Sequence, residues 1–87
     1  MSSLTLHAEP LAKSVTLTDA ELVVDLVDGR VLSTPLAWFP RLFAASPDAR
    51  AHFELLGNGE GIHWPDVDED ISVAGLLAGN PSVELRT

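Results

Sequence analysis

Hydrophobic and polar residues alternate between Val15 and Leu36, which is the pattern of strands that bury one face of a sheet. Asp19-Ala20 and Asp28-Gly29 interrupt this alternation, and each pair has the length of a two-residue hairpin turn. Residues paired across such turns point to the same side, so both turns together would align one set of side chains. This set comprises Val15, Leu17, Leu22, Val24, Leu26 and Val31. We therefore expect a three-stranded meander that ends near Pro35, because proline cannot donate a ladder hydrogen bond.

Helical spacing replaces the alternation after the third strand, and a short first helix is expected within residues 38–45. Ser46-Pro47-Asp48 then combines an N-cap serine, a proline in the first turn and an acid facing the positive end of the helix dipole. Gly57 can adopt the left-handed conformation that ends a helix. We expect a second helix between these two signals, with a buried face made of Ala49, Phe53 and Leu56.

The remaining residues predict one more strand and a third helix. Ile62-His63-Trp64 follows a glycine-rich loop and has the composition of a short strand. Asp70 or Ser72 can cap a helix that Gly79-Asn80-Pro81 would stop. Its apolar residues would be Ile71, Val73, Ala74, Leu76 and Leu77. For residues 82–87 the sequence leaves two alternatives, an added strand or a loose tail.

This order of elements predicts one α+β domain spanning residues 1–87, with a small antiparallel sheet packed against two or three short helices. The sheet would consist of the meander and the later short strand. A chain of 87 residues supports only one hydrophobic core. We divide it into an N-terminal segment 1–13, a core 14–79 and a tail 80–87.

The composition narrows the possible locations and chemistries. There is no cysteine, which excludes disulfides, thiolate zinc sites and cysteine nucleophiles. The first residues lack the basic start and apolar run of a signal peptide, and no run approaches the roughly 20 apolar residues that span a bilayer. We expect a cytoplasmic protein without membrane contact.

Negative charge is concentrated in the second half of the chain. The net charge is −8, and residues 51–85 contain no lysine or arginine. Their acids are Glu54, Glu60, Asp66, Asp68, Glu69, Asp70 and Glu84. Because nucleic-acid binding needs cationic side chains to replace phosphate counterions, we expect no direct contact with nucleic acid and favour a basic protein partner.

Four carboxylates at residues 66–70, close to His63, raise the question of a metal site. An EF-hand starting at Asp66 fails, because Ile71 stands where glycine is needed and Leu77 where a bidentate glutamate is needed. We interpret these acids as a solvated helix-capping run that can double as a partner surface, and expect no metal or cofactor.

No catalytic constellation is present, so we expect a protein that is not an enzyme. The sequence lacks G-x-S-x-G and HExxH, and the glycine-rich loop 57–61 lacks the lysine and serine or threonine of a phosphate-binding loop. Helix capping accounts for Ser46 and Ser72. Among the histidines His7, His52 and His63, the last is expected to have a half-buried structural or interface role.

Two interpretations are possible for the aromatic residues Trp38, Phe39 and Trp64. Each is large enough that we expect at least two of the three in the core. The alternative is that one tryptophan is exposed and anchors an interface, with Arg41 nearby.

Three blocks of sequence resemble a known family. They are DGR at 28–30, PLAWFPRL at 35–42 and GIHWPDVDEDISV at 61–73, the last continued by GLLAG at 75–79. Over residues 14–79 the chain resembles a bacterial and phage-borne family of small uncharacterised domains, one of which precedes a helix-turn-helix. The resemblance implies a small α+β fold and a neighbouring gene for another small protein, a pair similar to a toxin and its antitoxin. It implies no catalytic residues.

We therefore expect a non-enzymatic protein-binding module, the antitoxin-like partner of a small basic protein encoded next to it. A second hypothesis is a regulatory or DNA-mimicking protein that occupies a nucleic-acid-binding protein, and a third is a metal protein or enzyme that uses His63 and the 66–70 carboxylates. The edges of a short sheet also allow two chains to pair, so a homodimer is an open alternative to a monomer. The expected partner-binding residues are Trp38, Arg41, His63, Trp64, Asp66, Asp68, Glu69 and Asp70.

Overall fold

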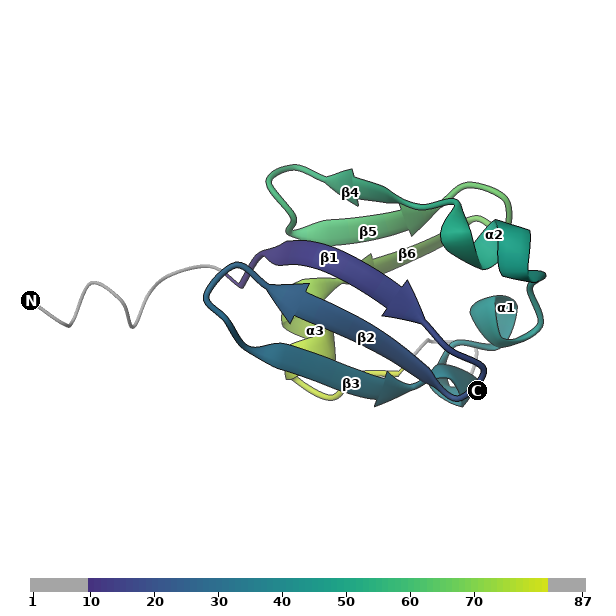
Figure 1. Ribbon diagram of the computed structural model, residues 1–87, viewed down its shortest axis with the longest axis horizontal. Coiled ribbons are helices and arrows are strands. Elements are labelled where there is room, and N and C mark those ends of the chain that lie inside the picture. The colour runs from purple at the N-terminus through teal and green to yellow at the C-terminus, as the bar shows by residue number, and fades with distance from the viewer. Residues whose placement is uncertain (1–9, 82–87) are drawn as a thin grey trace, which may run out of the picture.

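Two three-stranded antiparallel sheets form the frame of the computed structural model, which describes residues 10–81 (Figure 1). The first sheet has the order β1 (Ala12–Leu17), β2 (Glu21–Leu26), β3 (Val31–Pro35), and the second has the order β4 (Glu54–Leu56), β5 (Gly61–Trp64), β6 (Glu69–Ser72). Along the chain, three short helices follow β3 and precede β4: η2 (Leu36–Trp38), α1 (Pro40–Phe43) and α2 (Pro47–Ala51). A fourth helix, α3 (Val73–Leu77), follows β6. The α+β class is confirmed, but the second half of the chain contributes three strands where the sequence predicted one.

The predicted two-residue turn at Asp19-Ala20 joins β1 to β2. Leu17 pairs with Leu22, and the Thr18 amide donates to the Glu21 carbonyl over 2.9 Å. The Thr18 hydroxyl also accepts hydrogen bonds from the amides of Ala20 and Glu21, at 3.1 and 2.9 Å. A threonine before the turn thus supplies the local acceptor that stabilises it.

The hairpin between β2 and β3 is one residue longer than predicted, and this reverses the faces of β3. The Leu26 amide donates to the Arg30 carbonyl over 2.8 Å, which closes a three-residue loop with Gly29 at φ 97°. A shift of one residue moves every side chain of a strand to the other face. Val31 is therefore 58% exposed, contrary to prediction, and Leu32 packs against the core.

The second helix is shorter than the sequence predicted. α2 starts as expected, with the Ser46 hydroxyl accepting from the Ala49 amide at 3.1 Å, but it ends at Ala51. The indole N–H of Trp64 donates to the Arg50 carbonyl over 3.0 Å, and a longer helix would need that carbonyl for its own ladder. The expected helical residue Leu56 therefore lies in β4, paired with Gly61.

The third helix also starts later than its first possible cap. Ser72 is the N-cap of α3, and its hydroxyl accepts from the Gly75 amide over 2.8 Å. Asp70 and Ile71 lie in β6, paired with His63 and Ile62, so neither is helical. Ile71 still reaches the core, because alternate residues of β6 point inward.

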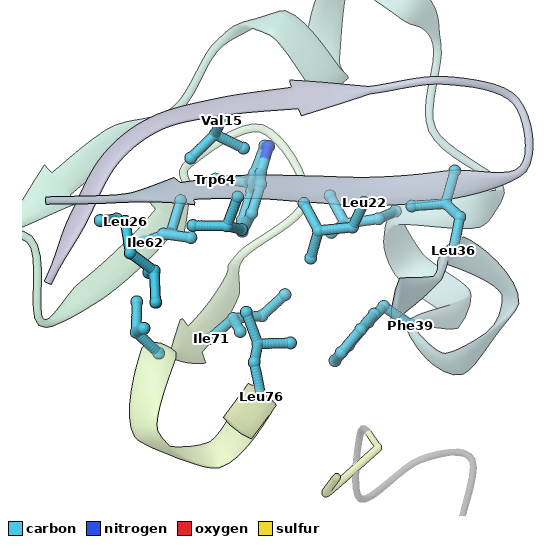
Figure 2. Close-up of a cluster of buried hydrophobic side chains, with 13 residues drawn as sticks. Val15, Leu22, Leu26, Leu36, Phe39, Ile62, Trp64, Ile71 and Leu76 are labelled. Carbon is cyan, nitrogen blue, oxygen red and sulfur yellow. The ribbon is translucent and has the colours of Figure 1, made fainter. Parts of the chain in front are cut away.

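The hydrophobic core lies between the two sheets and is closed by η2, α1 and α3 (Figure 2). Its fully buried members are Trp64, Leu22, Leu26, Leu36, Leu42, Ile62, Val24 and Val73. Trp64 and Phe39 are 0% and 3% exposed, which confirms that at least two of the three aromatic residues fill the core. Trp38 is half-buried against it.

A backbone contact joins the two sheets where β1 begins. The Ala12 amide donates to the Gly59 carbonyl over 2.7 Å, linking β1 to the loop between β4 and β5. Gly59 has φ 106°, and a Cβ atom there would lie 2.4 Å from the Ala12 carbonyl oxygen. Only glycine, which has no Cβ atom, allows the two backbones to lie this close.

Two predictions fall outside residues 10–81. They concern His7 and the alternatives of strand or tail for residues 82–87. Within the described part of the chain, no helix has the length and apolar character needed to cross a membrane.

Candidate protein-binding surface

A groove of about 330 Å³ runs beside β6 and contains four of the predicted partner-binding residues. Five consecutive residues, Asp68 to Ser72, form one side of it. The rest of the lining comes from Phe39 between η2 and α1, from Arg41 of α1, from Gly75 and Leu76 of α3, and from Asn80 and Pro81 after α3. We call this feature the β6 groove, and it brings together Arg41, Asp68, Glu69 and Asp70, which belong to segments far apart in the sequence.

Arg41 fixes one end of the β6 groove. Its guanidinium donates to the Asp68 carbonyl over 2.8 Å, with a longer contact of 3.5 Å to the Val67 carbonyl. Asp68 has φ 53°, a left-handed conformation that aspartate tolerates better than most residues other than glycine. The arginine on α1 thereby anchors the turn between β5 and β6, and this turn presents the Asp68 side chain to solvent.

The pleat of β6 separates its two acids. Asp70 points to the outer face of the second sheet and is exposed, whereas Glu69 points inward and is 8% exposed. The predicted helix-capping role of the 66–70 run is wrong, since these residues form the β5–β6 turn and the start of β6. Trp64 and Glu69 were expected to bind a partner, but the alternation of their strands turns both side chains inward, to 0% and 8% exposure.

An acid–histidine–acid row crosses the outer face of the second sheet. His63 Nδ1 lies 2.5 Å from the Asp70 carboxylate, and the two residues are direct cross-strand partners. On its other side His63 is paired with Glu54 of β4. The His63 side chain is 26% exposed, which agrees with the half-buried position expected for it. Strand pairing thus places an acidic residue on each side of His63.

A second histidine pair lies just beyond the C-terminal end of β5. His52 Nδ1 is 3.2 Å from both carboxylate oxygens of Asp66. The sequence did not single out this pair, because its members lie on opposite sides of the β4–β5 hairpin. The two pairs divide the acidic run, so Asp66 and Asp70 do not converge on one histidine. Among residues 10–81 no group of three or more histidine, aspartate or glutamate side chains is placed to hold a metal ion.

The fold thus separates the predicted partner-binding residues into those that line the β6 groove or adjoin it and those that do not. Arg41, Asp68 and Asp70 line the β6 groove, and His63 adjoins it through Asp70. Trp38 and Asp66 do not line the groove. The sequence missed the role of Glu54, which joins this surface only because β4 pairs with β5.

These features define a small α+β domain whose two antiparallel sheets enclose one core and whose second sheet has an acidic outer face. The chain belongs to DUF2442, a family described as proteins of unknown function, whose sequence profile matches residues 12–82. The match confirms the coarser expectation, that the chain belongs to a family of uncharacterised domains.

Two solved structures have the same fold. A crystal structure of a protein of unknown function from Rhodospirillum rubrum is 35% identical, with a TM-score of 0.73, and the match covers 86% of this chain and 93% of the other. A solution NMR structure of an uncharacterised protein from Chromobacterium violaceum is 22% identical, with a TM-score of 0.71 and coverage of 93% and 74%. No curated protein matches the chain.

Proposed function

We propose that this protein is a non-enzymatic binding module that recognises a basic protein through its acidic surface, defined as Glu54, Asp66, Asp68 and Asp70. The observation that carries the proposal is that two of these acids line the β6 groove, while a third continues the row across the sheet. All four belong to a segment, residues 51–85, without lysine or arginine. A surface of this kind attracts and orients a cationic partner.

The β6 groove also suits the shape of a basic side chain. Its walls include the half-buried Pro81, together with Phe39 and Leu76, whose exposure is only 3% and 8%. A lysine or arginine of the partner could lay its aliphatic stem on these walls and place its cation beside Asp68 and Asp70. The groove therefore offers both the apolar contact and the charge that one long cationic side chain requires.

A more specific proposal concerns the identity of the partner and the effect of binding on it. We infer that the partner is a small basic protein encoded beside this chain and that binding blocks its activity, as an antitoxin does. The support is the charge complementarity described above and the family resemblance in the sequence. Inhibition would follow if the cationic residues covered by this surface were those that the partner needs for its own target.

Copurification tests the proposal directly. The full chain, tagged and expressed in its source cells, should recover a basic protein whose retention falls as salt rises, because screening weakens exposed charge pairs. The variant Asp68→Asn/Asp70→Asn should weaken that association by about tenfold, since exposed pairs contribute about 0.2–1 kcal/mol each. Asparagine at position 68 tolerates the left-handed backbone, so the fold is kept.

A matched control separates local from overall charge. Glu21→Gln/Asp48→Asn removes two exposed acids from the first sheet and α2, away from the β6 groove. This variant should bind the partner as the wild-type chain does. Recovery of no protein, or equal weakening by both double variants, would contradict the proposal.

A further inference from the structure

Sheet edges expose unpaired backbone groups, and three of the four edges in this fold are protected. β1 has a register shift between Ala12 and Ser14, and α2 packs against it. β3 ends in Pro35, which has no N–H to donate. α3 packs against β6, and Arg41 binds the carbonyls of Val67 and Asp68 just before this strand. Bulges, prolines and covering elements of this kind prevent pairing with another chain.

The outer edge of β4 has none of these protections among residues 10–81. β4 pairs regularly with β5, without a register shift, and no described strand pairs with its other side (Figure 1). All three of its residues are exposed, and two of them, Leu55 and Leu56, are leucines at 38% and 43% exposure. A regularly paired edge with exposed apolar side chains and no proline or lysine can act as a template for strand addition.

We propose that an extended segment of the basic partner adds to β4 as a fourth strand of the second sheet. This inference rests on the proposed function, and it adds the manner in which the partner is held. Main-chain hydrogen bonds to the β4 edge would supply a directional contact that the charges alone do not provide.

The side chains of β4 specify what this segment carries. Glu54 lies on the outer face in the row with His63 and Asp70, so the residue beside it should be lysine or arginine. Leu56 lies on the same face, over Gly61, and Leu55 lies on the inner face, paired with Ile62. The residues of the added strand beside Leu55 and Leu56 should be apolar, because they would cover these exposed leucines. The segment therefore combines one cationic residue with apolar residues on either face.

A second copy of this chain fits the edge less well than a basic partner. Each copy has a net charge of −8, so two copies repel one another. A pair of three-residue strands also buries too little surface for a stable dimer. A basic partner avoids both problems, because its charge is opposite and it contacts the β6 groove as well.

A synthetic peptide with one central lysine flanked by valines, titrated into the isotope-labelled full chain, tests the proposal. The amide signals of residues 54–56 should shift and their hydrogen exchange should slow. Methylation of two adjacent backbone nitrogens at the centre of the peptide blocks both of its hydrogen-bonding edges and should weaken binding at least about tenfold. Glu54→Gln should weaken binding by a few-fold, whereas Glu21→Gln, on β2 of the other sheet, should not.

Three results would overturn the proposal. If the methylated peptide binds as well as the unmodified one, while Asp68→Asn/Asp70→Asn abolishes binding, recognition is by side-chain charge alone and the proposed function survives. If residues 54–56 shift with protein concentration in the absence of peptide, the edge belongs to a second copy. If the unmodified peptide does not bind at all, β4 is not a site for strand addition, and the copurification experiment remains the separate test of partner binding.

Discussion

Asp28 and Arg30 form a local ion pair beside the loop that joins β2 to β3. The Arg30 guanidinium donates to one carboxylate oxygen of Asp28 at 2.8 and 2.9 Å, and the Arg30 amide donates to the other at 3.0 Å. The side-chain hydrogen bond, followed by that of the backbone amide, holds the pKa of Asp28 below its usual value of 3.8. Both side chains are about half exposed, so this pair shapes the loop more than it stabilises the domain.

The lowered pKa of Asp28 has a defined pH dependence. A carboxyl group whose pKa is depressed by folding contributes stability above its usual pKa, and this contribution is lost as the pH falls through the folded value. Arg30→Gln should return the pKa of Asp28 towards 3.8, as measured by NMR titration of the side-chain carboxyl. Lys13→Gln removes a cation from β1 and should leave the pKa unchanged. An equal response to both variants would show that overall charge, and not the local hydrogen bonds, sets it.

At the scale of elements, local signals predicted how segments begin better than how far they extend. The caps Ser46 and Ser72 act where the sequence placed them, because capping involves only a few consecutive residues. The end of α2 could not be predicted, since the Trp64 side chain that donates to the Arg50 carbonyl comes from a strand 14 residues later. Three-residue and four-residue strands such as β4 and β6 are also too short to show a period of two clearly.

The junction between β1 and the β4–β5 loop should be sensitive to a single methyl group. Gly59→Ala would force a Cβ atom within 2.4 Å of the Ala12 carbonyl oxygen, at φ 106°. We expect a loss of about 3 kcal/mol in the free energy of unfolding, from backbone strain and displacement of the strand together. Urea unfolding measures this value.

Gly79 provides the control for that substitution. It also has a positive φ, 79°, but a Cβ atom there meets nothing within 4 Å. Gly79→Ala should therefore cost only the backbone strain, about 1 kcal/mol. Equal losses in the two variants would mean that the close contact between β1 and Gly59 does not constrain the fold.

At the scale of the whole molecule, negative charge opposes folding as well as attracting a partner. A net charge of −8 on 87 residues means that the folded state holds like charges closer together than the unfolded chain does. Sodium chloride at about 0.5 M shortens the screening length and should stabilise the protein by about 1 kcal/mol, or roughly 4–8 °C in Tm. Differential scanning calorimetry measures the change, and a Tm that falls with salt would show that attractive pairs such as Arg30 with Asp28 outweigh the repulsion.

The candidate surface could be predicted only in part, because the charge of a segment can be read from the sequence but the exposure of each acid depends on the fold of the whole molecule. Composition alone located the acidic segment, because charge is visible without a fold. Which acids face solvent depended on the pleat of β6, and the contact of Arg41 with the Asp68 carbonyl depended on packing between residues 27 positions apart. Neither Glu54 beside His63 nor the burial of Glu69 has a local signal in the sequence.

The three-residue loop between β2 and β3 has a consequence for the evolution of the family. Because its length decides which residues of β3 face the core, a relative that loses or gains one loop residue must also exchange the polar and apolar positions of the strand that follows. Insertions at this point should therefore be rare, or accompanied by a reversed alternation in β3. Loop length and the composition of β3 should therefore change together.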